Sequence, residues 1–235
     1  MRRISIRLWI MGTLLSSAAA VHAQSRPAVV ELFTSQGCSS CPPAEAYVGE
    51  LVQRPDVLAL TFHVDYWDDL GWRDLHGLPA ATQRQRTYAR ALGLSSVYTP
   101  QMVIDGSGDF VGTDRPRITR ALAQARAGVA VALSVAKPDI SIDLGGQTGA
   151  APCEVLLVAF ARSAVSSIGR GENAGRTIEE FNIVRELRVL GRWDGRPQQF
   201  RARVDSLPGD ATDVAVLVQR LGQAPIIGAA SARLR

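Results

Sequence analysis

Lysine, histidine and cysteine are all scarce in this chain of 235 residues. Lys137 is the only lysine, which together with the abundance of alanine and arginine suggests a GC-rich bacterial genome. The three cysteines include one closely spaced pair and no second pair, which argues against a four-cysteine metal site. Internal repeats and low-complexity tracts are absent as well. The remaining composition, with 46% hydrophobic residues, is that of a globular protein that can fill a core.

Long apolar runs are missing after the N-terminus. At the N-terminus itself, Arg2, Arg3 and Arg7 precede an apolar stretch over residues 8–15, and a small-x-small sequence ends at Ala23. This is the layout of a cleaved secretory signal, and the stretch is shorter than the roughly 20 residues needed to span a bilayer. We therefore expect a signal peptide over residues 1–23, cleavage after Ala23, and a periplasmic or secreted protein with no membrane span.

An excess of charge of one sign is also missing from the rest of the chain. Three of the 26 basic residues lie in the expected signal peptide, which leaves 23 basic residues against 22 acidic ones. This near-neutral balance gives no electrostatic basis for binding nucleic acid or anionic lipid. We therefore expect neither as a partner.

The pattern of apolar residues changes near residue 128. Before it, short apolar runs predict strands over residues 29–34, 57–62, 101–104 and 109–111, which alternate with helices over residues 42–53, 79–92 and 115–127. After it, β-branched residues alternate with polar ones between Gly and Pro turns. The βαβαββα order is that of a thioredoxin-type core. We expect this α/β domain over residues 24–127 and an antiparallel β-sandwich domain over residues 128–235.

A Cys-x-x-Cys sequence directly follows the first apolar strand. Cys38 and Cys41 come at the start of the helix expected over residues 42–53, where prolines are tolerated because the first N–H groups of a helix have no intrahelical partner. Those N–H groups and the helix dipole favour a thiolate and can lower a cysteine pKa to roughly 3.5–7.5. We therefore expect a reactive dithiol that closes a disulfide, with Cys38 exposed and Cys41 shielded.

The cysteine pair has two other possible uses. It can be a structural disulfide, since exported proteins use disulfides as staples. It can also hold copper or zinc together with His63, with His76 or Asp65 as a further ligand. The third cysteine, Cys153, precedes a strongly apolar strand, and we expect it to be a buried small hydrophobic residue.

The expected topology brings three segments to one edge of the sheet. The first two strands are joined by a helix, so they should be parallel, and chemistry gathers at the carboxyl ends of such strands. Cys38 lies at that edge, as do His63 and Asp65, which follow the second strand. The third strand runs the opposite way, so the segment 98–100 before it returns to the same edge. His63 and Asp65 are thus candidate substrate-binding residues, although a capping loop with satisfied hydrogen bonds is the plainer interpretation.

These segments resemble a known superfamily and a narrower family. A Cys-x-x-Cys that opens a helix, followed by Thr99-Pro100 immediately before a strand-turn-strand, is similar to the thioredoxin-like superfamily. The sequences at 31–43, 63–68, 98–106 and 173–176 resemble a secreted bacterial family named domain of unknown function 1223. This resemblance covers essentially the whole chain after the signal, and it implies a fold but no established reaction.

The superfamily resemblance implies roles for four residues. Pro100 would be a cis-proline packed against the dithiol, and the backbone of Thr99, next to Tyr98, would pair with an extended substrate peptide. Thioredoxins also carry a buried acid on the first strand as a proton acceptor, and Glu31 is the only acid on this strand. It lies one residue further from Cys38 than the superfamily pattern, which turns a side chain to the opposite face of a regular strand. Glu31 is a candidate to deprotonate Cys41, with a paired structural glutamate as the alternative.

Together these patterns predict an exported thiol–disulfide oxidoreductase. In this hypothesis Cys38 forms a mixed disulfide with a protein partner and Cys41 resolves it, without a cofactor. The alternatives are a non-enzymatic binding module with a thioredoxin fold, or a copper- or zinc-handling protein that uses Cys38, Cys41 and His63.

Overall fold

The computed structural model describes residues 24–124, 126–223 and 225–234. The signal peptide expected over residues 1–23 and its cleavage site lie outside the described residues. Among the residues that the structure describes, no helix is long and apolar enough to cross a membrane.

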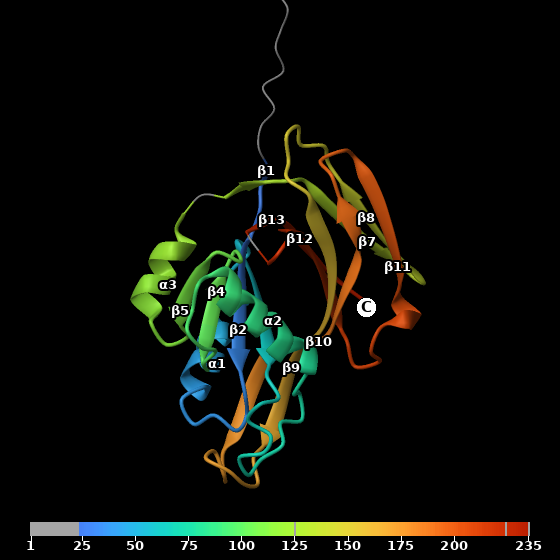
Figure 1. Ribbon diagram of the computed structural model, residues 1–235. Coiled ribbons are helices and arrows are strands. Elements are labelled where there is room, and N and C mark those ends of the chain that lie inside the picture. Colours follow the sequence, from blue (N-terminus) through green and yellow to red (C-terminus); the bar gives the residue numbers. More distant parts are fainter. Residues whose placement is uncertain (1–23, 125, 224, 235) are drawn as a thin grey trace, which may run out of the picture.

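The first half of the chain alternates strands and helices (Figure 1). Its elements are β2 (Ala28–Thr34), α1 (Pro42–Leu51), β3 (Val57–His63), α2 (Pro79–Ala91), β4 (Gln101–Ile104), β5 (Gly108–Val111) and α3 (Arg115–Leu122). All seven positions of β2 and of β3 are buried, which is why most of their residues are apolar. Each helix carries a proline in its first turn, where no intrahelical N–H bond is lost. The expected boundaries agree with these within about two residues, except that α3, expected to end at residue 127, ends at Leu122.

The second half is built of strands. They are β6 (Ala127–Gly128), β7 (Val131–Ala136), β8 (Asp139–Leu144), β9 (Cys153–Ser167), β10 (Thr177–Trp193), β11 (Gln198–Arg203), β12 (Asp213–Arg220) and β13 (Ile226–Arg233), with a short 3-10 turn, η1 (Val204–Ser206), after β11. The strand β6 pairs with β1 (Gln24–Ser25). The sequence analysis did not predict β13, because its small residues around Gly228 lack the β-branched pattern of the other strands.

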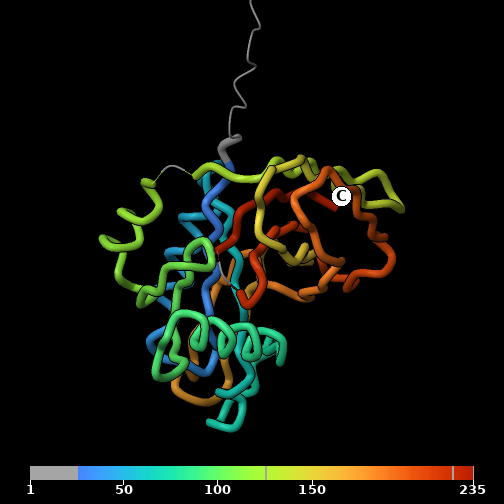
Figure 2. The backbone as a smooth tube through the Cα atoms, turned by 45° about the horizontal axis from the view of Figure 1, so that its top comes forward, coloured from blue at the N-terminus to red at the C-terminus, as the bar shows by residue number. Residues whose placement is uncertain are grey.

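One sheet runs through both halves of the chain. Its eight strands follow the order β13-β12-β9-β10-β3-β2-β4-β5. The halves join where β10 lies parallel to β3, with Ile183 opposite Thr61. Figure 2 shows the two halves side by side, blue to green against yellow to red. The boundary expected near residue 128 is therefore not a boundary of the sheet.

Packing on the sheet separates into three clusters of buried residues. One contains α2 residues such as Tyr88 with alternate residues of β2, β3, β9 and β12. The second contains α1 and α3 residues against the remaining positions of β2 and β4. The third fills the space between β9 and β12 and a separate three-stranded antiparallel sheet, β11-β8-β7. The small sheet of the second half therefore covers strands that continue the main sheet.

The long β9–β10 hairpin extends to the end of the molecule where β2 and β3 finish. Its tip, residues 168–176, lies near the loops that follow β2 and β3 (Figures 1 and 2). The tip is closed by backbone hydrogen bonds between Ile168 and both Arg176 and Gly175. This arrangement brings residues about 135 positions apart in the chain to one site.

Candidate functional site

Three chain segments meet at the carboxyl ends of the parallel strands β2 and β3. Thr34 and His63, the last residues of the two strands, are directly paired. The strand β4 is antiparallel to β2 and places Gln101 opposite Phe33, so the residues before β4 return to this edge. This is the juxtaposition expected from the sequence.

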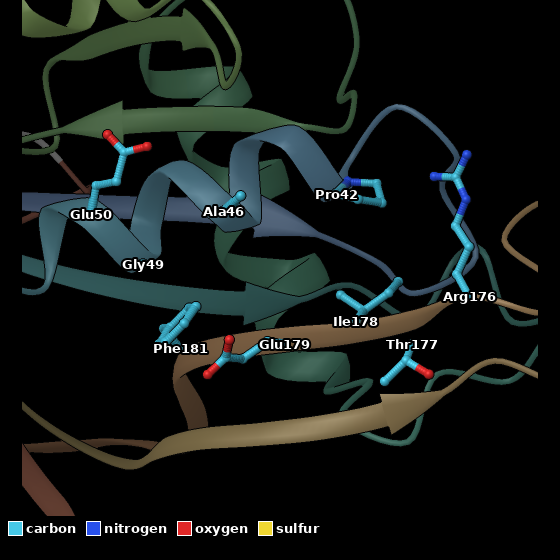
Figure 3. A pocket seen from close by; sticks show the side chains of 9 residues that line it. All are labelled: Pro42, Ala46, Gly49, Glu50, Arg176, Thr177, Ile178, Glu179 and Phe181. Atoms are coloured by element: carbon cyan, nitrogen blue, oxygen red, sulfur yellow. The ribbon is translucent and has the colours of Figure 1, made fainter.

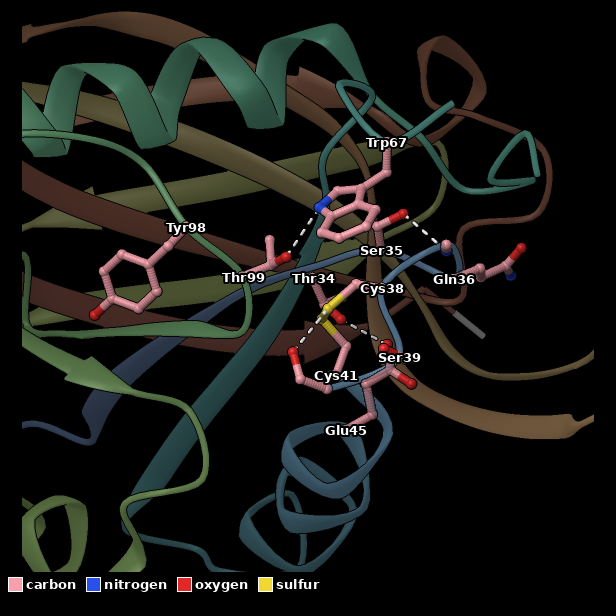
Figure 4. Close-up of a disulfide and its surroundings, with 12 residues drawn as sticks. Thr34, Ser35, Gln36, Cys38, Ser39, Cys41, Glu45, Trp67, Tyr98 and Thr99 are labelled. Carbon is pink, nitrogen blue, oxygen red and sulfur yellow. Dashed lines mark hydrogen bonds between the residues drawn. A yellow bond between two sulfur atoms is a disulfide. The ribbon is translucent and has the colours of Figure 1, made fainter. Parts of the chain in front are cut away.

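A disulfide joins Cys38 and Cys41 at this edge, with their Cα atoms 5.5 Å apart (Figure 4). Cys41 is the N-cap residue of α1, and its carbonyl accepts from the backbone N–H groups of Ala44 and Glu45. Cys38 lies in the preceding turn, where its sulfur accepts from the Ser40 hydroxyl at 3.3 Å. Because the two sulfurs are bonded to each other, both lie near the positive end of the helix dipole.

Both cysteines are buried in the disulfide form. Cys38 and Cys41 are each 0% exposed, although Ser39 and Ser40 between them are exposed. Trp67 packs over the turn before Cys38, with its Cβ only 3.3 Å from where a Cβ on Gly37 would lie. In the disulfide form Cys38 is therefore not exposed, because the loops that follow β3 and β9 cover it.

The tip of the β9–β10 hairpin is fastened to the disulfide loop. The buried Asn173 side chain donates from Nδ2 to the backbone carbonyls of Gln36 and Cys38, both at 2.9 Å. The Glu172 carboxylate accepts from the Ser39 N–H at 3.0 Å. The sequence predicted no functional role for residues 171–176. The Asn-Ala-Gly-Arg sequence that contributed to the family resemblance was the signal that could have drawn attention to it.

Thr99 and Pro100 occupy the segment before β4, and the peptide bond between them is cis. Pro100 is buried, and Thr99 accepts a hydrogen bond from Trp67 Nε1 at 2.9 Å (Figure 4). Tyr98 donates its hydroxyl to Asp109 at 2.9 Å. Burial and this carboxylate raise the pKa of Tyr98 above its usual value. Tyr98 and Thr99 thus lie at the expected edge, and the side chain of each forms a hydrogen bond with another side chain of this protein.

Glu31 does not lie on the dithiol side of the sheet. It points to the face covered by α2, whereas α1 covers the opposite face. Arg84 donates to it at 2.6 Å, and the Tyr88 hydroxyl donates to its other oxygen. Glu31 as the proton acceptor for Cys41 is therefore wrong, because the strand register turns it away and the α2 side chains already pair with it. It is a paired structural glutamate.

His63 is fully buried, and its two ring nitrogens face carboxylates of this chain rather than the surface. Its Nδ1 lies 2.8 Å from the Asp74 carboxylate and its Nε2 lies 3.6 Å from Glu180. Burial alone lowers the pKa of His63, but the surrounding carboxylates outweigh it and raise the pKa to about 9. Burial alone raises the pKa of Asp74, but the same pairing brings it down to about 2. The expected substrate-binding role of His63 is thus replaced by a place in a buried charge network.

Glu45, one turn after Cys41 on α1, belongs to the same buried network. Its Oε1 accepts from the Thr34 hydroxyl at 2.6 Å, while Oε2 has no hydrogen-bond partner among the described residues. Burial raises the pKa of Glu45 to about 7, against the opposing effect of the positive charge on His63. Ligand atoms of Glu45, His63 and Glu180 all lie within 4.8 Å of one another. No comparable group within the described ranges includes the cysteines.

Gln36 connects this network to the hairpin. Its Nε2 donates to the Ser166 hydroxyl at 2.9 Å and to Glu180 at 3.0 Å. Its Oε1 accepts from Trp72 Nε1 at 3.0 Å. The residue just ahead of the Cys-x-x-Cys sequence thus bonds to side chains from β9, β10 and the loop after β3.

Asp65 is half-buried and lies in the loop after β3. It accepts from the Thr82 hydroxyl on α2, and it lines a cavity of about 470 Å³ together with Asp68 and Asp74. Asp65 therefore lies at the expected edge, facing the α2 side of the loop.

A groove of about 520 Å³ runs between α1 and the start of β10 (Figure 3). Pro42 and Gly49 line it from the helix, and Ile178 and Phe181 line it from the strand. A Cβ on Gly49 would lie 2.6 Å from the Phe181 ring, so only glycine fits there without a shift. The groove begins beside Cys41, at the first residue of α1.

The third cysteine takes no part in this site. Cys153 is buried at the start of β9, its thiol lies 3.3 Å from the Ala151 carbonyl, and burial raises its pKa. This agrees with the expected role as a small hydrophobic residue.

Comparisons with known proteins identify the family. A comparison with curated proteins found no match. The crystal structure of a protein from Agrobacterium tumefaciens is similar, with 31% sequence identity and a TM-score of 0.76 over 90% of this chain and 96% of that one. The model of the family described as protein of unknown function (DUF1223) matches residues 29–219. The chain therefore belongs to the DUF1223 family.

Proposed function

We propose that this chain carries out thiol–disulfide exchange with protein thiols or disulfides through Cys38 and Cys41. The observation that carries this proposal is the position of the disulfide, at the N-terminus of α1 and at the edge where β2 and β3 end. A helix N-terminus favours the thiolate form, which is the nucleophile in exchange. The neighbouring Thr99-Pro100 segment supports a thioredoxin-like relationship for the first half of the chain.

The exchange has two steps, each of which forms one disulfide and breaks another. With the dithiol reduced, the Cys38 thiolate attacks a disulfide of the partner, forms a mixed disulfide, and releases one partner thiolate. The Cys41 thiolate then attacks the Cys38 sulfur, closes the Cys38–Cys41 disulfide and releases the second partner thiolate. Two electrons pass to the partner, and the reverse sequence oxidises a partner dithiol.

Access to Cys38 requires the loops above it to open. The contacts that must break are those of Asn173 with the Cys38 carbonyl and of Glu172 with the Ser39 N–H. Residues 168–176 are joined to the rest of the chain through the two strands of one hairpin, so their movement leaves the sheet intact. An extended partner segment would then lie against the Thr99 backbone.

The proposal includes export to a periplasmic or extracellular location. The expected signal peptide and the disulfide are both consistent with a compartment in which disulfides persist.

The deciding experiment uses two single variants, Cys41→Ser and Cys38→Ser, expressed with the native N-terminus and quenched with acid before thiols are alkylated. Without the resolving thiol, Cys41→Ser accumulates mixed disulfides, seen as slower bands that disappear on reduction. Cys38→Ser lacks the attacking thiol and traps none. If neither variant traps a partner, the pair is a structural disulfide and the exchange proposal fails.

A further inference from the structure

We propose that Glu45, His63 and Glu180 form a binding site for one divalent transition-metal ion, built without the cysteines. The site is buried and lies one turn of α1 below Cys41. It goes beyond the proposed exchange activity and does not depend on it.

The positions of the three donors suit a metal of this class. The candidate ligand atoms lie within 4.8 Å of one another, and His63 Nε2 is 3.6 Å from Glu180 Oε1. Two ligands of a tetrahedral Zn²⁺ lie about 3.3 Å apart when the metal–ligand bonds are about 2.0–2.1 Å. Small side-chain adjustments therefore complete three ligand bonds, and a water molecule can take the fourth position.

Two of the donor atoms are buried with no hydrogen-bond partner among the described residues. They are His63 Nε2 and Glu45 Oε2, on side chains of residues that are 0% and 2% exposed. Buried polar atoms are usually paired, so an unpaired atom in a native site needs an explanation. Each of these two residues contributes a ligand atom to the group within 4.8 Å, so a cation bound between them would supply the missing partner.

Each candidate ligand is also oriented by a hydrogen bond to a neighbouring side chain, as ligands in metal sites usually are. Asp74 lies 2.8 Å from His63 Nδ1, which turns Nε2 toward the carboxylates, and a metal that binds there takes the place of the Nε2 proton. The Thr34 hydroxyl donates to the bonded oxygen of Glu45 at 2.6 Å. Ser166 donates to Glu180 Oε2 at 2.6 Å and Gln36 donates to Oε1 at 3.0 Å, which holds Oε1 on the side of His63 Nε2. Carboxylate–histidine–metal arrangements have this form.

The charges favour a dication. Three buried carboxylates, those of Glu45, Asp74 and Glu180, surround His63. Arg185 contacts His76 at 2.7 Å, and His76 Nε2 in turn lies 3.2 Å from Glu180 Oε2. The cavity lined by Asp65, Asp68, Arg73 and Asp74 shares Asp74 with the network, and its acidic residues outnumber its one basic residue. One imidazole with two carboxylates suits Zn²⁺ or another transition metal better than Mg²⁺ or Ca²⁺, which prefer oxygen ligands alone.

The test uses the purified chain with its disulfide closed, so that the sulfurs are not available as ligands. The protein is stripped with EDTA and titrated with Zn²⁺ by calorimetry, and bound zinc is counted after desalting. We expect one Zn²⁺ per chain, a rise in the thermal unfolding midpoint with added Zn²⁺, and at least tenfold weaker binding for both Glu45→Gln and Glu180→Gln.

A matched control and a second probe keep the test decisive. Glu50→Gln, also on α1, removes an exposed carboxylate and should bind zinc like the parent chain. Should Glu45→Gln or Glu180→Gln fail to fold, as judged by circular dichroism, the visible spectrum of the Co²⁺-loaded parent chain reports the ligands instead. A spectrum without sulfur-to-cobalt charge transfer supports the site. Absence of binding to the disulfide form, or binding only after reduction, overturns it.

Discussion

The buried ion pair between Glu31 and Arg84 makes a quantitative prediction about stability. Their side chains are 0% and 3% exposed and their charged atoms lie 2.6 Å apart. Glu31→Gln keeps the shape of the side chain and leaves the Arg84 guanidinium buried without a carboxylate. Removing one partner of a buried pair typically costs about 3–5 kcal/mol, a large share of the roughly 5–15 kcal/mol that stabilises a typical protein. We therefore expect a decrease of about 4 kcal/mol in the free energy of unfolding.

Urea unfolding at pH 7, followed by tryptophan fluorescence, measures this change. The control is Glu50→Gln, which breaks the exposed Glu50–Arg115 pair and should change the free energy of unfolding by less than about 1 kcal/mol. Because Glu31 lies on the face away from α1, the alkylation rate of reduced Cys41 should not change in Glu31→Gln. A loss of stability below about 1 kcal/mol, or a slower Cys41 reaction, would refute the structural role of Glu31.

Three further predictions concern the network, the hairpin tip and the groove. With EDTA present, the stabilising contribution of His63 should be complete below its ordinary pKa of 6.5 and lost as pH rises through about 9, a loss of about 3 kcal/mol. A urea midpoint that stays constant over this range, or that varies equally in His63→Gln, would contradict it. Asn173→Ala loses two hydrogen bonds over the disulfide and should speed its reduction by dithiothreitol roughly 5–30-fold, measured as thiol release; an unchanged rate argues against the hairpin as a cover. Gly49→Ala should lower the free energy of unfolding by about 1–3 kcal/mol through the clash with Phe181, and Phe181→Leu should restore part of it. An increase in the free energy of unfolding of Gly49→Ala, the usual effect of Gly→Ala in a helix, would contradict this prediction.

The arrangement of the first half was predictable because it depends on local patterns. Apolar runs marked β2 and β3, and a proline in the first turn marked the start of α1. The rule that a helical crossover joins parallel strands then placed Cys38, His63 and Thr99 at one edge.

The buried network could not be predicted, because it depends on contacts between distant parts of the chain. Gln36 bonds to Glu180 across 144 positions, and no periodicity in the sequence records that pairing. Glu45 reads as an ordinary acidic residue in a first helical turn, which is a common place for one. Which of Glu31 and Glu45 lies on the same side of the sheet as the disulfide became clear only from the structure, in which α1 and α2 cover opposite faces of β2.

The continuation of the sheet into the second half was missed for a related reason. A strand such as β10 shows by its pattern that it is a strand, but its pairing with β3 rests on a single registered pair, Ile183 with Thr61. The expected separate domain followed from the change of composition near residue 128. Composition indicates which elements form but does not determine which strands pair with each other.

The reduction potential of the Cys38–Cys41 pair tests the exchange proposal most directly. The purified chain is equilibrated in glutathione buffers of graded ratio, thiols are trapped with acid and alkylated, and the disulfide fraction is measured by peptide mass. We predict a potential between roughly −270 and −120 mV, the range of exchange-active dithiols, with full reversibility. A potential below about −300 mV is typical of structural disulfides and would contradict the proposal.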